Sequence, residues 1–452
     1  MVLTLLQGIE SPIEGWSVLR GLDMFVEEHG FRTGSAFEQF NEIPNDPAEF
    51  DTFVARNRQK IEPWLAAVFQ AEHLSLLLGS GFTTGISYVS GSAATGMATT
   101  ETTSKYSDQI MAHAKSSAEK MGRGAPNIED QLRTAIALWE GLRIIDPDEA
   151  EKLKSDLDQW IKNFLKSLLA TERGIKDSND TTAKSLLQSF LLSFASRAAS
   201  RERLNVFTTN YDRLIEYGCD MVGLRIIDRF VGMITPQFRN SRIELDYHYN
   251  PPGIRGEPRF MEGVLRLTKL HGSLDWRFDE NERHIARTDL PFGASDDHPS
   301  IPKSAVETVM IYPNAAKDVE TNNYPYAELF RDFASAVCRP NSALVTYGYG
   351  FGDDHINRVI KDMLSVPSAH LVVIVYAIDD RTRKFIASLN SAQLTVLAGS
   401  HFANIQHLVD DYLPKPALDF ISNRMAELLK NRPSTANAAP IAQEDDEGSA
   451  VQ

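Results

Sequence analysis

Four short groups of glycine and polar residues each follow an apolar run, and their residue types could do chemistry. In chain order they are Gly79-Ser80-Gly81, Thr209-Asn210-Tyr211-Asp212, His271-Gly272-Ser273 and Gly348-Tyr349-Gly350. Glycines after a strand let backbone amides approach a phosphate group at the start of a helix. An asparagine side chain offers both a donor and an acceptor, and a histidine exchanges a proton near neutral pH. Such residues could bind a nucleotide and move a proton.

Each group also has a purely structural explanation when it is considered alone. Gly79–Gly81 is shorter than a full GxGxxG phosphate loop. Asn210–Asp212 can be a plain turn with an Asx cap, and a single histidine is more often structural than catalytic. The segment 348–352 can be a strand-to-helix loop capped by Asp353 or Asp354. One shared site is a simpler explanation than four unrelated ones in this order.

The apolar runs before these groups have the length and composition of buried strands. They are His73–Leu78, Leu204–Thr209, Val264–Leu270 and Ala343–Tyr347, joined by the valine-rich His370–Ile378 and by Glu307–Ile311. Helix-sized segments such as Asp354–Leu364 and Arg381–Leu389 lie between them. Apolar strands that alternate with helices predict a parallel sheet covered on both faces. Ligands bind at the carboxyl ends of such strands, so we expect the four groups to converge on one crevice.

Helical spacing marks Glu49–Phe69 and most of the segment from Asn127 to Phe194. Asn127 can cap one helix, and Asp146-Pro147 can begin the next. The apolar stripe that follows Pro147 indicates core packing rather than a cofactor site. The segment from Ser80 to Ser104 is rich in small residues, which predicts either a flexible surface loop or a mobile lid over a ligand.

Composition narrows the functional class. The chain has 452 residues, of which 42% are hydrophobic, and this content is typical of a globular protein. Its formal charge of −15 argues against binding of nucleic acid by this chain alone. Cys219 and Cys338 form no CxxC pair, so neither a structural zinc ribbon nor a disulfide framework is expected. Cys219 is interpreted as a core thiol. Without a convincing signal peptide or a long apolar run, a cytoplasmic location without membrane association is expected.

Five motifs, taken together, resemble the SIR2 family of NAD-consuming proteins, which includes the sirtuins. They are LLLGSG (76–81), PNIEDQL (126–132), FTTNYDRLIE (207–216), KLHGSLDW (269–276) and TYGYGFGDDHIN (346–357). The resemblance covers about residues 70–400. It implies an α/β fold with a Rossmann-like parallel sheet, a helical insertion and no zinc module. The expected domains are a mostly helical extension (1–70), the SIR2-like domain (71–430, insertion about 105–200) and a disordered acidic tail (431–452).

Site roles follow from the resemblance by position. Asn210 and His271 take the catalytic positions. The cofactor-binding positions fall on Gly79, Ser80, Gly81, Thr209, Asp212, Gly348 and Tyr349. NAD would be the substrate, and no metal is expected. Nicotinamide is a cationic leaving group that departs without a proton donor, so the enzyme must stabilise the sugar cation and deliver water. Asn210 can orient the ribose or the water, and His271 can act as general base, a role typically worth about 10²- to 10⁴-fold in rate.

The chain departs from the sirtuin deacylases, because it lacks the four cysteines of their zinc module, has TTN where they have TQN, and shows no GIPDFR segment. The resemblance to bacterial SIR2-like proteins instead implies an NAD glycohydrolase that depletes NAD in antiphage defence by abortive infection. It also implies a homo-oligomer and, as one partner class, a HerA-type ATPase. The alternatives are a sensor that binds NAD or ADP-ribose without hydrolysis and, less favoured, a protein deacylase.

Overall fold

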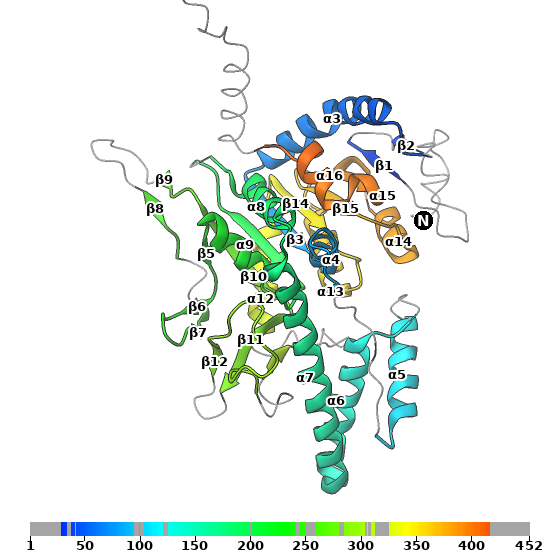
Figure 1. Cartoon of the computed structure of the whole chain (residues 1–452), viewed down its shortest axis with the longest axis vertical. Helices are drawn as coiled ribbons and strands as arrows, with labels where there is room; N and C mark the ends of the chain where they lie inside the picture. Colours follow the sequence, from blue (N-terminus) through cyan, green and yellow to red (C-terminus); the bar gives the residue numbers. More distant parts are fainter. Residues whose placement is uncertain are drawn as a thin grey trace, which may run out of the picture. The chain divides into compact units, whose positions relative to one another are not determined.

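Nine strands build the main sheet in the order β2-β1-β16-β15-β14-β3-β4-β10-β5 (Figure 1). Every neighbouring pair from β16 to β5 is parallel, and β1 and β2 add an antiparallel edge. The strands are β1 (His29–Arg32), β2 (Glu38–Phe40), β3 (His73–Leu78), β4 (Leu204–Thr208), β5 (Arg225–Ile227), β10 (Val264–Lys269), β14 (Ser342–Tyr347), β15 (His370–Val375) and β16 (Leu394–Ala398).

The computed structural model describes part of the chain. The described residues are 29–33, 38–40, 42–94, 99, 104–120, 125–198, 200–240, 245–249, 259–279, 284–302, 305, 309–311, 325–389 and 391–415. The helix expected after Pro416 and the acidic tail at 431–452 lie outside these residues.

Helices cover both faces of the main sheet. The described helices are α3 (Pro47–Phe69), α4 (Ser80–Val89), α5 (Ser107–Lys120), α6 (Ile128–Ile145), α7 (Pro147–Asp177), α8 (Thr182–Ala195), α9 (Leu214–Val222), α12 (Tyr326–Val337), α13 (Asp354–Met363), α14 (Asp380–Ala387), α15 (Gly399–Phe402) and α16 (Ile405–His407). Of these, α5, α6 and most of α7 pack in a separate hydrophobic cluster. In β3, Leu76 packs with residues of α4 and α8, whereas Leu77 packs on the other face with residues of α12 and α13. The predicted α/β class with a mostly parallel central sheet is therefore confirmed.

A second, five-stranded sheet was not predicted. Its order is β13-β11-β12-β7-β6, with β6 (Phe230–Val231), β7 (Gln237–Phe238), β11 (Gly272–Asp279), β12 (His284–Arg287) and β13 (Val309–Ile311). A separate pair joins β8 (His248–Tyr249) and β9 (Arg259–Phe260). Most of these strands are too short to show a clear alternating pattern, and Val309–Ile311 joins this sheet rather than the main one. Because β11 begins directly after His271, that residue lies where the two sheets meet.

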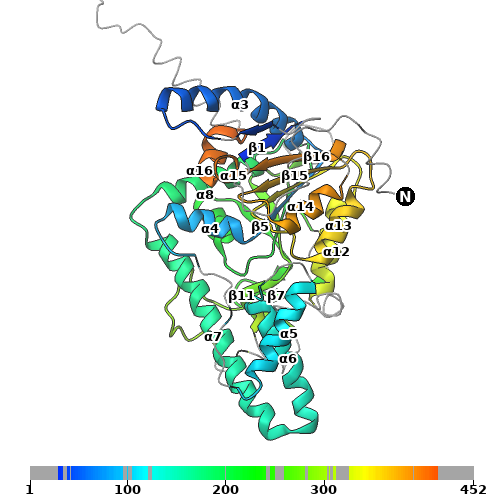
Figure 2. The ribbon, with the colours of Figure 1, turned by 90° about the vertical axis from the view of Figure 1, so that its right-hand side faces the viewer.

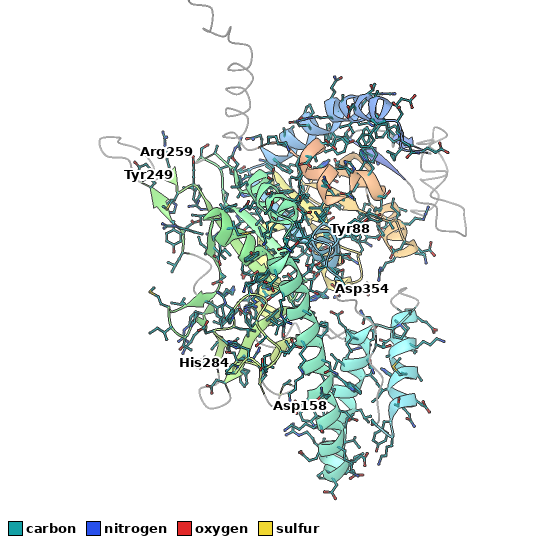
Figure 3. All side chains as sticks on the ribbon, in the orientation of Figure 1. Tyr88, Asp158, Tyr249, Arg259, His284 and Asp354 are labelled. Atoms are coloured by element: carbon teal, nitrogen blue, oxygen red, sulfur yellow. The ribbon has the colours of Figure 1, made fainter. Side chains whose placement is uncertain are left out.

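The helices between β3 and β4 follow their local sequence signals. Asn127 and Asp130 form a reciprocal capping box at the start of α6, and Asp146 caps α7, whose first residue is Pro147. In Figure 2, α5, α6 and α7 lie side by side. Asp158 lies on α7 (Figure 3). It accepts a hydrogen bond from the amide of Ala305 (2.6 Å), which ties the helices to a segment distant in the sequence.

The loop predicted from Ser80 is wrong over residues 80–89, because α4 begins directly after β3 and buries Phe82 and Ile86 in the core. The mobile lid proposed for this stretch is therefore not supported at α4. The sequence did not predict β1, β2 or β16. The predicted domain limits stay predictions.

Cys219 is fully buried, and burial raises the pKa of its thiol, which agrees with a core role.

No helix among the described residues combines the length and apolar character that a membrane crossing needs.

Candidate active site

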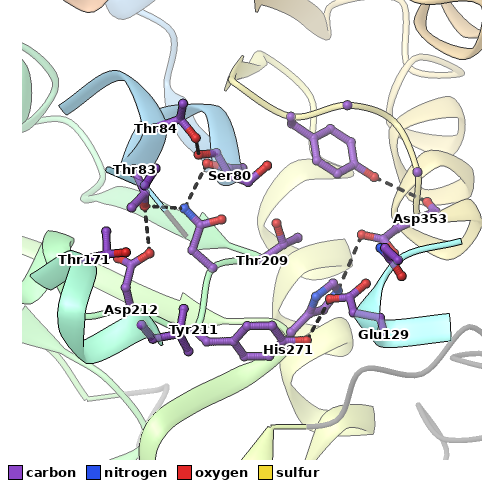
Figure 4. A pocket seen from close by; sticks show the side chains of 18 of the residues that line it. Ser80, Thr83, Thr84, Glu129, Thr171, Thr209, Tyr211, Asp212, His271 and Asp353 are labelled. Atoms are coloured by element: carbon purple, nitrogen blue, oxygen red, sulfur yellow. Dashed lines mark hydrogen bonds and ion pairs between the residues drawn. The ribbon is translucent and has the colours of Figure 1, made fainter. Parts of the chain in front are cut away.

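An open pocket lies at the carboxyl ends of the parallel strands (Figure 4). Its volume is about 240 Å³, below the ~300–1,000 Å³ of sites that enclose a drug-sized ligand, so a dinucleotide would extend beyond it. The lining residues are Gly79, Ser80, Thr83, Thr84, Ala94, Asn127, Glu129, Leu168, Thr171, Thr209, Asn210, Tyr211, Asp212, His271, Tyr349, Gly350, Gly352, Asp353 and Arg381.

The sheet topology explains why these residues meet. Strand β3 has β14 on one side and β4 on the other, and β10 follows β4, all in parallel. The segments that follow these four strands therefore leave the sheet at the same edge. Each of the four groups picked out in the sequence contributes at least one lining residue. The expected convergence on one crevice is confirmed as geometry, although the roles of the individual residues stay predictions.

Asn210 is held by three hydrogen bonds. Its Nδ2 donates to the carbonyl oxygen of Gly79 (2.9 Å) and to Thr83 Oγ1 (3.0 Å), and its backbone amide donates to Thr208 Oγ1 (3.0 Å). Since the Gly79 carbonyl can only accept, these contacts decide which end of the amide is nitrogen. The Asn210 side chain is thus fixed in one orientation before any ligand binds.

Asp212 extends the same network. Its Oδ2 accepts a hydrogen bond from Thr83 Oγ1 (2.7 Å), and its Oδ1 accepts from the amide of Leu214 (3.1 Å). The second contact is the Asx-type bond that a plain turn would also make. The first is not, because Thr83 comes from a different element, α4, and lies beside Asp212 (Figure 4). Thr83 therefore couples the Asp212 carboxylate to the Asn210 amide.

The Tyr211 side chain points away from Asp212 and toward α6, which it joins to the pocket. Its hydroxyl donates to Glu129 Oε1 (3.0 Å), and its ring lies edge-on to Phe164 of α7. Burial, and then the Glu129 carboxylate, raise the pKa of the Tyr211 phenol well above its ordinary value. Lys269 holds the backbone of this turn, because its Nζ donates to the carbonyl oxygens of Tyr211 and Asp212. The same Nζ also donates to the Glu216 carboxylate.

His271 is buried, with 4% of its surface exposed, and it faces an aspartate. Its Nε2 lies 3.5 Å from Asp353 Oδ2, which is ion-pair distance but long for a hydrogen bond (Figure 4). The Tyr211 ring lies 6.2 Å from the imidazole, between centroids. Asp353 occupies the N-cap position of α13, yet its side chain makes no capping hydrogen bond. The capping role considered for Asp353 is therefore wrong.

The loop after β14 is held mainly from within its own segment. Phe351 has a left-handed backbone (φ 51°), which is uncommon for a bulky residue. Asn357 Nδ2 donates to the Phe351 carbonyl oxygen (2.9 Å), and the Tyr349 hydroxyl donates to Asn357 Oδ1 (3.3 Å). Burial, and then the Asp353 carboxylate, raise the pKa of Tyr349 well above its ordinary value. Asn357 thus keeps this loop in a conformation that its sequence disfavours.

The glycines that were expected to line a pyrophosphate pack against each other. The Gly79 amide donates to the Tyr347 carbonyl (3.0 Å), and the Gly81 amide donates to the Gly348 carbonyl (3.1 Å). Gly348 has φ +62°, and a Cβ there would lie 2.6 Å from the Gly81 Cα. Gly81 and Gly348 are absent from the pocket lining, and Gly79 and Ser80 are present. These glycines allow two backbone segments to touch, and their cofactor-binding roles stay predictions.

Helix α7 supplies a wall that sequence reasoning missed. Leu168 and Thr171 line the pocket, and the next residue, Glu172, forms a buried ion pair with Arg213 (2.6 Å). Burial raises the pKa of the Glu172 carboxyl, and the Arg213 guanidinium opposes that rise. Gly293 also donates its amide to Glu172 (2.9 Å). This ion pair anchors α7 to the turn that carries Asn210.

Other lining residues were also not predicted. Glu129 and Asp353 lie inside the two motifs NIE and GYGFGDDHIN, so their motifs were recognised although their positions in the site were not. No motif marks Thr83, Thr171 or Arg381, which reach the pocket only because the chain folds. No group of three or more His, Cys, Asp or Glu in the described part of the chain is arranged to hold a metal ion.

Comparison with known proteins adds a family-level finding. No curated protein matches the chain. Residues 204–395 match the SIR2-like domain family, and this stretch includes the Asn210 turn, His271 and the loop after β14. SIR2-like domains are related to NAD as their substrate or cofactor. The match and the mostly parallel α/β sheet together support a SIR2-like protein.

Proposed function

We propose that the protein is an NAD glycohydrolase that converts NAD and water into nicotinamide and ADP-ribose. The observation that carries this proposal is the meeting of a pre-oriented Asn210 amide and a buried His271–Asp353 pair in one strand-end pocket. The SIR2-like match gives the substrate class.

The proposed chemistry uses groups that are already in place. The glycosidic bond between C1′ of the ribose and the nicotinamide nitrogen breaks, and both electrons of that bond leave with nicotinamide, which becomes neutral. Water adds to C1′, and its proton passes to His271, whose imidazole is suited to this exchange near neutral pH. The Asp353 carboxylate, 3.5 Å away, stabilises the imidazolium that forms. Asn210 orients the ribose or the attacking water.

The test is nicotinamide release from NAD by the purified protein, compared with Asn210→Ala and His271→Ala. We expect each variant to lose at least about 100-fold in rate while its melting temperature stays near that of the unchanged protein. Full activity in both variants would overturn the mechanism. Tight NAD binding without nicotinamide release, with possible partner proteins added, would favour the non-hydrolysing sensor instead.

We further propose that hydrolysis serves antiphage defence by depleting NAD, in a homo-oligomer controlled by a partner such as a HerA-type ATPase. The motif resemblance alone supports this role. An NADase that is always active would harm its own cell, which is why control by assembly is expected. Loss of protection against phage in cells that carry His271→Ala is the expected outcome. Equal protection by the variant would contradict the defence role.

A further inference from the structure

Charge is distributed unevenly around the pocket. Glu129, Asp212 and Asp353 are carboxylates, and Arg381 is the single arginine or lysine among the described lining residues. A dinucleotide carries two negative charges on its diphosphate. Bringing an anion beside three carboxylates is costly unless a cation pairs with it. Since the amides of Gly79 and Gly81 donate to backbone carbonyls, the glycine loop offers fewer donors than the motif suggested.

Arg381 has unused hydrogen-bonding capacity. Its Nη2 donates to Asp379 Oδ2 (3.0 Å), while its buried Nε has no hydrogen-bond partner. A guanidinium has five N–H donors in one plane, and an unmet buried donor costs about 1–3 kcal/mol. Asp379 is itself fixed, because its Oδ1 caps α14 by accepting from the amide of Thr382 (2.7 Å). The guanidinium is thus anchored on one side, with donors still available.

The position of Arg381 fits a ligand rather than the protein core. It is the second residue of α14, after the carboxyl end of β15, the strand next to β14. Its Nη2 would lie 3.5 Å from a Cβ at Gly350, so the side chain rests against the loop after β14. The absence of a side chain at Gly350 leaves the guanidinium accessible from the pocket.

We propose that Arg381 binds the diphosphate of the dinucleotide substrate. The inference rests on the proposed function, because it assumes that the pocket takes a pyridine dinucleotide. Arg381 would supply the paired, charge-assisted hydrogen bonds that arginine makes to phosphate. Through the guanidinium donors other than the buried Nε, the phosphate would help to balance the three carboxylates. The reacting ribose would then lie toward Asn210 and His271.

The experiment measures the binding of ADP-ribose, 2′-phospho-ADP-ribose and adenosine by calorimetry to the full chain. Arg381→Gln is compared with Lys384→Gln, which removes the same charge from an exposed position of α14 outside the pocket lining. We expect Arg381→Gln to weaken ADP-ribose about 10- to 100-fold and adenosine less than about 2-fold. Lys384→Gln should bind all three ligands as the unchanged protein does.

The outcomes separate the alternatives. A loss shared by ADP-ribose and its 2′-phosphate supports the contact with the diphosphate, whereas a loss confined to the 2′-phosphate form overturns it and assigns Arg381 to that phosphate instead. Unchanged affinity in Arg381→Gln, or an equal loss for adenosine, overturns the inference and leaves the proposed function standing. Failure of the unchanged protein to bind ADP-ribose or NAD at all overturns the proposed function, and the inference falls with it.

Discussion

The turn after β4 and the loop after β14 reach the same pocket but are held in different ways. The turn is held by residues far away in the chain, namely Thr83 on Asn210, Lys269 on the Asp212 carbonyl and Glu172 beside Arg213. The loop is held largely by its own neighbours, through Tyr349 and Asn357. The side-chain hydrogen bonds that hold the turn therefore come from distant elements, whereas those named for the loop come from its own segment.

The largest expected effect comes from breaking the anchor of the turn. Glu172→Ala leaves Arg213 as a buried charge without its carboxylate and should lower the free energy of unfolding by about 3–5 kcal/mol. Urea denaturation measures the loss. The double replacement Glu172→Leu with Arg213→Met removes both charges and should recover much of it. A loss below about 1 kcal/mol in Glu172→Ala would mean that the ion pair does not anchor α7.

Gly348→Ala tests the junction between the loop and the glycine segment. The new Cβ would meet the Gly81 Cα at 2.6 Å on a left-handed backbone, so we expect a loss of about 2–4 kcal/mol in thermal or urea unfolding. Gly91→Ala is the matched control, because Gly91 has a similar φ (+69°) with nothing near its Cβ position, and it should lose only about 1–2 kcal/mol. Equal losses would show that the contact with Gly81 is unimportant.

Acid sensitivity should arise away from the pocket, at the start of β15. Burial, and then the positive charge of Arg32, lower the pKa of His370 to about 4. The folded state therefore binds this proton less readily than the unfolded state, whose histidine pKa is about 6.5. The stabilisation is present above pH 6.5 and declines as the pH falls toward 4, by about 1–2 kcal/mol between pH 7 and pH 5.

Unfolding measured at both pH values, in the unchanged protein and in His370→Asn, checks this effect. The variant should show a smaller drop in stability between pH 7 and pH 5. An equal drop in both proteins would assign the acid sensitivity to other groups.

The smallest expected effects come from removing one hydroxyl group at the turn after β4 and one in the loop after β14. Thr83→Val keeps the shape of the side chain but removes the hydroxyl that joins Asn210 to Asp212, so we expect about a 10-fold loss in kcat/KM for NAD. Tyr349→Phe removes a hydroxyl from the loop after β14, where its two hydrogen bonds are long (3.3 and 3.4 Å), and should change kcat/KM by less than about 3-fold. A larger effect in Tyr349→Phe would reverse the comparison.

Local sequence patterns were informative wherever one element supplied its own signal. The apolar runs of β3 and β14 and the caps at Asn127 and Asp146 depend on neighbours in the chain, and the structure has them as expected. The short strands of the second sheet carry too few residues for a pattern. Helix α4 was missed because small residues hid its two buried apolar positions, Phe82 and Ile86.

The sequence by itself determined the four strands that precede the polar groups and the convergence of those groups, because parallel strands bring their carboxyl ends to one edge. Only the tertiary structure decided which partners those groups meet. It placed Thr83 against Asn210, Asp353 against His271 and Arg381 in the lining. Hydrogen bonds and ion pairs act over a few ångströms in space, and the spacing of residues along the chain does not record such distances.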